Sequence, residues 1–161
     1  MGRRGPLATH TVKLTTARAR PTAVVAQATT WEEFPRLWGR LLDEVYAVLR
    51  DGEAPDATRQ ARPRWQNVML YKDDVPNVEV GVLASGPFAT NGRVVPSVLP
   101  AGEVAMTVHR GPYSELDRAH RAVRDWCAAR GRQLAGARWE IYGHWREDPR
   151  ELETEVCYLL C

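Results

Sequence analysis

An internal repetition constrains this chain most strongly, because its two halves contain the same succession of predicted elements. Each half contains a strand, a helix that opens with a capping pattern, a strand that ends near a tyrosine, a turn, and a strand with Glu-Val. The first unit covers about residues 10–84 and the second about residues 103–160, and residues 85–102 form a connector rich in proline and glycine. This order predicts an α+β domain of two pseudo-symmetric βαββ repeats, with antiparallel sheets and one main helix per repeat.

Individual positions also correspond between the two units. The M-L-Y of residues 69–71 matches the E-I-Y of residues 140–142, and the E-V of residues 79–80 matches that of residues 155–156. Chance similarity between two ordinary α+β segments is the alternative explanation. Because the order of elements and the matched residues agree, we adopt the repeat as the working hypothesis.

A central ligand groove is expected where the two repeats meet about a pseudo-twofold axis. Equivalent positions then face each other across the groove, so that Met69 and Tyr71 oppose Glu140 and Tyr142. A polarizable thioether on one wall and a single carboxylate on the other suit the promiscuous binding of flat cations.

The predicted helix of the first unit carries a continuous apolar face. Apolar residues recur at helical spacing over residues 34–49, and residues 30–33 have the form of a capping box. Trp38 lies on this face, so it belongs either to the core or to the groove. In the second unit, residues 114–117 have a similar capping form, and Gly131 is suited to end the helix that follows.

Length, charge and cysteine content exclude several classes of protein. The chain of 161 residues predicts one domain, with residues 1–9 disordered and residues 10–161 folded as a single unit. A formal net charge of +2 argues against direct binding to nucleic acid. Three cysteines without a C-x-x-C pair, no secretory signal and no apolar run of roughly 20 residues favour a cytoplasmic protein outside the membrane. No spacing of histidines or cysteines indicates a metal site, and no motif indicates a cofactor.

Residues 138–145, R-W-E-I-Y-G-H-W, concentrate chemically active side chains in one predicted strand. Alternation along a strand places Glu140 and Tyr142 on one face and Trp139 on the other. A carboxylate among aromatic rings can bind a flat cation through charge and stacking. It can also act as a general acid whose pKa is raised by apolar neighbours, and the sequence leaves both roles open. Pairing with one of the many arginines is a third, structural role for Glu140.

Three further tryptophans differ in the positions that the sequence allows them. Trp65 shares strand parity with Met69 and Tyr71, so the groove and the core are equally consistent with it. Trp139 belongs in the core unless a twist or a bulge of the strand exposes it. Trp145 begins a loop and is a candidate for covering the groove.

Four stretches together carry a resemblance to a known family. They are H-R-G-P-Y-S-E-L at residues 109–116, W-E-I-Y at 139–142, T-E-V-C-Y-L-L at 154–160 and L-Y-K-D at 70–73. With them, the chain from residue 10 to residue 160 resembles the GyrI-like small-molecule-binding family, which includes gyrase-inhibitor proteins and the effector domains of drug-sensing transcription activators.

The resemblance implies a pair of βαββ repeats around a central ligand groove. It implies that Glu140 contacts the positive charge of lipophilic cations and that Tyr71 and Tyr142 occupy aromatic positions of the pocket. Glu155 matches an acidic position near the pocket in some members. Cys157 departs from the family pattern, because it stands where an aromatic residue is common.

Three functions are compatible with this site, and we rank a stand-alone multidrug-binding protein first. It would bind lipophilic, mostly cationic aromatic molecules without a catalytic residue, for sequestration or resistance. The resemblance also allows a hydrolase that opens cyclopropane rings of DNA-alkylating natural products, in which Glu140 donates a proton or activates water and Tyr71 or Tyr142 assists. The third function is a protein-binding module such as a gyrase antagonist. About ten residues precede the first strand, too few for a helix-turn-helix, so we expect no direct binding to DNA.

Overall fold

The computed structural model of the chain describes residues 10–51, 65–85 and 88–161. The segment that the sequence predicts to be disordered, residues 1–9, lies outside the described residues. Most of the expected loop between the first helix and the next strand, residues 52–64, and residues 86–87 of the expected connector lie outside them as well.

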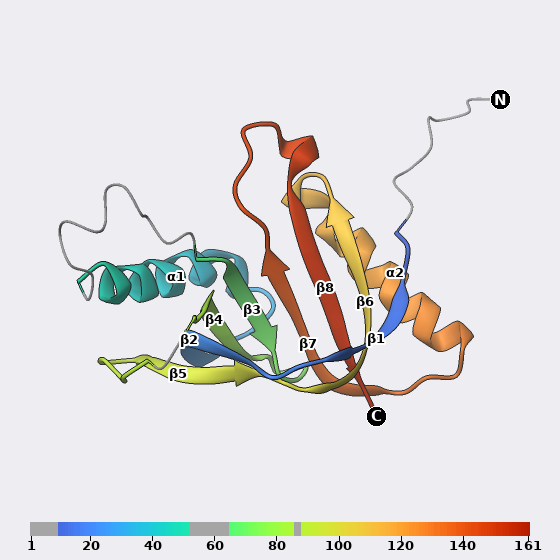
Figure 1. The fold of residues 1–161 in the computed structure, drawn as a ribbon, viewed down its shortest axis with the longest axis horizontal. Helices are drawn as coiled ribbons and strands as arrows, with labels where there is room; N and C mark the ends of the chain where they lie inside the picture. Colours follow the sequence, from blue (N-terminus) through green and yellow to red (C-terminus); the bar gives the residue numbers. More distant parts are fainter. Residues whose placement is uncertain (1–9, 52–64, 86–87) are drawn as a thin grey trace.

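The described residues form eight strands and two α-helices (Figure 1). In chain order they are β1 (Lys13–Ala17), β2 (Arg20–Ala28), α1 (Phe34–Asp51), β3 (Asn67–Tyr71), β4 (Asn77–Leu83), β5 (Val94–Leu99), β6 (Gly102–Arg110), α2 (Leu116–Ala129), β7 (Leu134–Tyr142) and β8 (Glu153–Leu160). Two short 3-10 turns, Tyr113–Glu115 and Pro149–Glu151, precede α2 and β8.

All eight strands belong to one antiparallel sheet, in the order β1-β6-β8-β7-β3-β4-β2-β5. The predicted α+β class is therefore confirmed, with a single continuous sheet in place of separate ones. The first unit contributes β3, β4 and β2 outward from the middle, and the second contributes β7, β8 and β6 in the corresponding order. The two units are joined where β3 pairs with β7.

The predicted connector at residues 85–102 contains a strand, which corrects the sequence-based expectation. Strand β5 pairs with β2, and Pro96 lies within it opposite Ala23. Proline is tolerated here because β5 is the outermost strand, where one row of N–H groups has no strand to bond. Three valines and a leucine supply the strand propensity that the proline and glycine content of this segment obscured.

The N-terminal stretch forms two strands, β1 and β2, that serve different halves of the sheet. Strand β2 pairs with β4 and β5 of the first unit, whereas β1 crosses to the second unit and pairs with β6. Each half thus receives one additional outer strand, β5 beside β2 and β1 beside β6.

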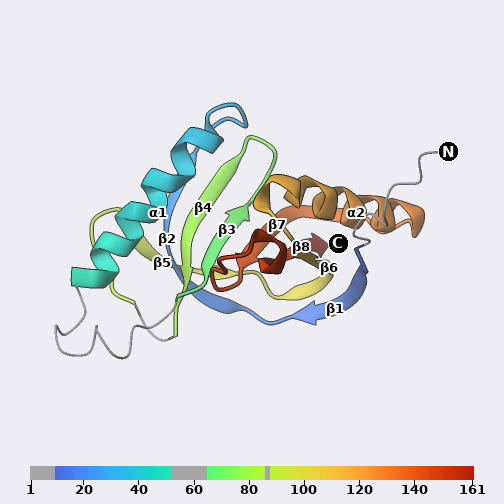
Figure 2. The same cartoon turned by 90° about the horizontal axis from the view of Figure 1, so that it is seen from above.

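Both helices lie on the same face of the sheet (Figure 2). Helix α1 packs over β2 and β4, and α2 packs over β6 and β8. On the opposite face, apolar side chains from both halves form one buried cluster. The members of this cluster are Val24, Val68, Leu70, Leu99, Val104, Trp139, Ile141 and Cys157.

The two helices begin differently, although the sequence predicts a capping box for each. At α1, the Thr30 hydroxyl accepts a hydrogen bond from the Glu33 backbone N–H at 3.1 Å. At the start of α2, among the described residues, no side chain makes a capping hydrogen bond, and the 3-10 turn Tyr113–Glu115 leads into the helix instead. Gly131, with φ of +65°, ends α2 in the left-handed conformation that glycine adopts without strain.

Three findings about the described part of the chain bear on its environment and chemistry. No helix within it combines the length and the apolar character that crossing a membrane requires. No group of three or more histidine, cysteine, aspartate or glutamate side chains within it is placed to hold a metal ion. Cys127 and Cys157 are buried free thiols, and Cys161 is an exposed one.

The close approach of β4 to β2 gives a testable consequence at Gly81. A Cβ atom at this position would lie 1.9 Å from the backbone oxygen of Ala23, so the strands must separate to accept any side chain. We expect Gly81→Ala to lower the free energy of unfolding by about 3 kcal/mol in urea denaturation. Gly39→Ala in α1 is the matched control, because its Cβ meets nothing within 4 Å and should add about 0.5–1 kcal/mol of stability. Equal stability of the two variants would contradict this strand packing.

Candidate functional site

An open groove lies above the join between the two units, with β3 and β7 as its floor and the beginnings of α1 and α2 at its sides. Its volume is about 340 Å³. Eleven residues line it: Phe34, Pro35, Trp38, Leu42, Asn67, Met69, Tyr71, Tyr113, Leu116, Glu140 and Tyr142. The lining is mainly aromatic and aliphatic, with a single acidic side chain, which is the usual character of a small-molecule site.

The register between β3 and β7 places the floor residues. Met69 pairs directly with Glu140, so both side chains point to the same face of the sheet. Tyr71 and Tyr142 lie two residues further along their own strands and therefore share this face. The structure thus brings together four of the residues that the sequence singled out.

The Glu140 carboxylate is buried, with 4% of the residue exposed, and two tyrosine hydroxyls and a histidine ring surround it. Its Oε1 accepts hydrogen bonds from the hydroxyls of Tyr71 at 3.0 Å and Tyr142 at 2.7 Å. Its Oε2 lies 2.6 Å from Nε2 of His120, on α2. Hydrogen bonds from several donors offset the cost of removing a negative charge from water.

The two tyrosines are held in their protonated form. Burial raises the pKa of Tyr71 far above its ordinary value, and the negative charge of Glu140 raises it further. The pKa of Tyr142 is raised well above its ordinary value by the same two causes in the same order. Both hydroxyls therefore remain hydrogen-bond donors to Glu140 at neutral pH.

Aromatic rings form the walls of the groove. The Phe34 ring packs edge-on against Tyr71 with centroids 5.6 Å apart, and Tyr113 packs edge-on against Tyr142 at 5.3 Å. Trp38 is 40% exposed although it lies on the apolar face of α1, because the groove leaves that part of the helix uncovered. Its indole face is therefore accessible to a ligand.

Trp31 extends the aromatic surface beyond Tyr71. The two ring centroids are 5.5 Å apart, and the Arg138 guanidinium lies 5.4 Å from the Trp31 ring. Arg138 also forms an ion pair with Asp74 at 2.8 Å. On this neighbouring surface, the guanidinium cation of Arg138 therefore makes a cation–π contact with Trp31.

Four other residues that the sequence proposed do not line the groove. Trp139 is 2% exposed and lies with Glu155 on the opposite face of the sheet, where both border a separate cavity of about 340 Å³. Strand alternation is the cause, because Glu155 pairs with Ile141, which points away from Glu140. Trp65 packs edge-on against Tyr46, and Trp145 lies 73% exposed in the loop between β7 and β8.

Several site residues were not identified as such from the sequence, although patterns in it could have indicated them. Phe34 and Leu42 lie four residues before and after Trp38, which the sequence did propose, and the three residues form one line on α1. His120 falls within the apolar stripe of α2, next to Ala119, where a polar side chain needs a buried partner. The position of His120 in that stripe therefore indicates a buried polar partner, which the structure shows to be Glu140.

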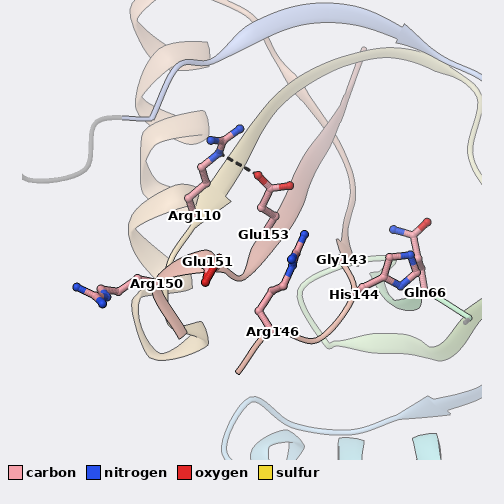
Figure 3. Close-up of a pocket in the computed structure, with 8 residues that line it drawn as sticks. All are labelled: Gln66, Arg110, Gly143, His144, Arg146, Arg150, Glu151 and Glu153. Carbon is pink, nitrogen blue, oxygen red and sulfur yellow. Dashed lines mark ion pairs between the residues drawn. The ribbon is translucent and has the colours of Figure 1, made fainter. Parts of the chain in front are cut away.

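A larger cavity, of about 490 Å³, lies beside the loop between β7 and β8 and is polar (Figure 3). Its lining consists of Gln66, Arg110, Gly143, His144, Arg146, Arg150, Glu151 and Glu153. Arg110 pairs with Glu153 at 3.1 Å, and Arg150 pairs with Asp148 at 2.9 Å. Opposite charges thus largely cancel there, and no Phe, Tyr or Trp among the described residues lines this cavity, so the smaller groove is the candidate functional site.

The fold is an α+β domain with one eight-stranded antiparallel sheet and an aromatic groove above the β3–β7 join. The GyrI-like small-molecule-binding domain family matches residues 10–160, and the chain belongs to this family. The resemblance that the sequence motifs indicated is thereby confirmed.

Several solved structures share the fold. The C-terminal domain of EcmrR is 18% identical with a TM-score of 0.72, over 94% of this chain and 98% of its own. SAV2435 bound to tetraphenylphosphonium is 10% identical with a TM-score of 0.66, over 94% of each chain. A hydrolase from Listeria innocua is 13% identical with a TM-score of 0.62, over 93% of this chain and 91% of its own. At these identities the likeness establishes the fold alone. A search of curated protein sequences gave no match.

The buried hydroxyls around the groove predict a loss of stability at alkaline pH. The pKa of every tyrosine in the chain is raised in the folded state, chiefly by burial. An unfolded tyrosine ionises near pH 10, so stability is complete below that pH and falls as the pH rises above it. We expect Tyr71→Phe to flatten this fall in urea unfolding measured across the alkaline range.

The half-exposed Tyr113 supplies the control for this measurement. Tyr113→Phe should change the slope of stability against pH less than Tyr71→Phe, because Tyr113 is not bonded to Glu140. Ultraviolet absorbance of tyrosinate gives the same information directly. A wild-type titration with all tyrosines ionising near pH 10 in the folded protein would rule out the buried hydroxyl cluster.

Proposed function

We propose that the protein binds lipophilic cations with aromatic rings in the groove above β3 and β7, without transforming them. The observation that carries this proposal is the Glu140 carboxylate, buried at the floor of an open aromatic groove and held by hydroxyl donors. A ligand there meets one negative charge and rings that can stack on it. By binding without release of a product, such a protein lowers the free concentration of a toxic cation.

Two contributions to the binding free energy have different roles: ring burial supplies affinity, and the charge of Glu140 supplies selection for cations. Burial of the ligand's rings supplies about 25 cal/mol per Å² before the costs of association. The carboxylate at roughly 5 Å from a positive centre contributes about 3 kcal/mol at an effective dielectric constant of about 20. The apolar walls provide the first contribution to any aromatic ligand, whereas Glu140 favours cations alone.

A relative with the same fold supports this choice of ligand. The structure of SAV2435 contains bound tetraphenylphosphonium, a cation whose charge is surrounded by four phenyl rings. The groove described here offers aromatic walls for such rings and one carboxylate for the charge. We therefore choose tetraphenylphosphonium as the probe and tetraphenylborate, of similar shape and opposite charge, as its counterpart.

Charge selection by Glu140 is the first test of the proposal. We expect wild-type protein to bind tetraphenylphosphonium more tightly than tetraphenylborate. Glu140→Gln should lower the affinity for tetraphenylphosphonium by about 30-fold or more. Glu155→Gln is the matched control, because it removes an acidic charge from the opposite face of the sheet and should leave both affinities unchanged. Equal binding of the two ions by the wild type, unaffected by Glu140→Gln, would refute cation binding at this site.

Removal of an aromatic wall should lower affinity without changing selectivity. Trp38→Ala truncates an exposed ring at the groove, so we expect both tetraphenyl ions to bind about tenfold more weakly, at a nearly constant ratio. Trp145→Ala removes an even more exposed tryptophan that does not line the groove, and it should change neither affinity. Isothermal titration calorimetry measures all four values. Identical effects of the two tryptophans would place the ligand elsewhere.

A hydrolase is the second candidate function. The observation that favours it is the contact of Glu140 with two tyrosine hydroxyls and a histidine, which is compatible with activation of water. One relative of the same fold is described as a hydrolase. Incubation with a cyclopropane-containing alkylating compound separates the two functions, since only a hydrolase yields a ring-opened product that disappears in Glu140→Gln.

A further inference from the structure

His120 links Glu140 to a chain of hydrogen bonds that ends at a charged residue on the surface of α2. Its side chain is 14% exposed, and both ring nitrogens have partners. Nε2 lies 2.6 Å from Oε2 of Glu140, and Nδ1 lies 2.7 Å from the hydroxyl oxygen of Tyr158. The same hydroxyl oxygen accepts a hydrogen bond from the Arg124 guanidinium at 3.0 Å.

The direction of each hydrogen bond in this chain follows from the chemistry of its members. Arginine can only donate, so the Tyr158 oxygen is an acceptor toward Arg124. The Tyr158 hydroxyl must then donate its own proton to another atom. Within the described part of the chain, the acceptor in reach of this hydroxyl is Nδ1 of His120. Tyr158 is buried, and a buried hydroxyl that donates no hydrogen bond would lower the stability of the fold.

The remaining nitrogen of His120 is fixed by the same reasoning. If Nδ1 accepts a proton from Tyr158, it carries none of its own, and the proton of the ring must lie on Nε2. That proton points at Oε2 of Glu140, which is an acceptor. The whole chain is satisfied by a neutral imidazole in the Nε2–H tautomer, whereas a doubly protonated ring would compete with the proton of Tyr158.

We propose that His120 is a specificity-determining positioning residue, held neutral by Arg124 and Tyr158 so that Glu140 keeps its full negative charge toward the groove. This inference rests on the proposed binding of cations. His120 does not line the groove itself and acts through the carboxylate. A neutral donor stabilises the charge of Glu140, while a positive one would cancel it at 2.6 Å and remove the preference for cations.

Charged and titratable groups from each neighbouring element are consistent with this arrangement. From β7, the Glu140 carboxylate contacts the imidazole of His120. From β8, the Tyr158 ring and hydroxyl contact the same imidazole. Arg124 approaches from the same helix, and Arg138 on β7 lies close enough to act on Tyr158.

Nitrogen NMR of the wild-type protein tests the tautomer without any ligand. With ¹⁵N-labelled histidine, the ring nitrogens of the four histidines give distinct shifts for protonated and unprotonated states, and His120→Gln identifies the signals of His120 by their loss. We expect an unprotonated Nδ1 and a protonated Nε2 at neutral pH. A doubly protonated ring, or the opposite tautomer, overturns the proposal.

Binding of the two tetraphenyl ions tests the consequence. His120→Gln retains a neutral N–H donor for Glu140, and we expect the cation-to-anion affinity ratio to stay within about threefold of the wild type. His120→Leu removes the donor, and the ratio should fall by about tenfold or more, with tetraphenylborate affinity as the internal check that the groove is intact. An unchanged ratio in His120→Leu, or an equal loss in both variants, overturns the proposal.

The failure of this inference is distinguishable from the failure of the proposed function. If Glu140→Gln abolishes the cation preference and His120→Leu does not, cations still bind at the groove and only the role of His120 is refuted. If the wild type shows no preference for the cation, the proposed function itself fails. The tautomer found by NMR then stands as a structural feature of the buried carboxylate alone, and the specificity role is refuted.

Discussion

The antiparallel pairing of β3 with β7 is the contact on which both the sheet and the groove depend. It joins the two units into one eight-stranded sheet and sets Met69 directly against Glu140. Helices α1 and α2 pack mainly over strands on either side of this join. Strands β3 and β7 form the floor of a groove whose sides are the two helix beginnings. A groove of this kind follows from the arrangement of the two units, not from any one loop.

The floor carries a buried charge that the surrounding structure compensates with polar groups. Two tyrosines and a histidine bond the Glu140 carboxylate, and burial keeps the tyrosines protonated. A buried carboxylate without such donors would be costly enough to bind a proton instead. In the function that we propose, this carboxylate attracts the positive charge of a ligand at the floor of the groove. The two tyrosines and the histidine also hold the carboxylate in one orientation.

Sequence patterns predicted the features that follow from local periodicity. The alternation of residues 138–145 placed Glu140 and Tyr142 on one face and Trp139 on the other, and the apolar spacing of α1 predicted its extent closely. The patterns failed where long-range pairing decides the outcome. Strand β5 forms in spite of Pro96 because an outer position tolerates it, and Glu155 faces away from the groove because of its register with β7. His120 lies close to neither Glu140 nor Tyr158 in sequence, so their contact exists only in the folded chain.

A crystal structure of the protein with tetraphenylphosphonium tests the central claim most directly. We predict that the phosphorus lies above the join of β3 and β7, with phenyl rings against Trp38 and Tyr142 and with Glu140 still bonded to its tyrosines. A cation bound instead in the polar cavity beside Arg110, or on the opposite face beside Trp139, would contradict the assignment of the groove as the binding site.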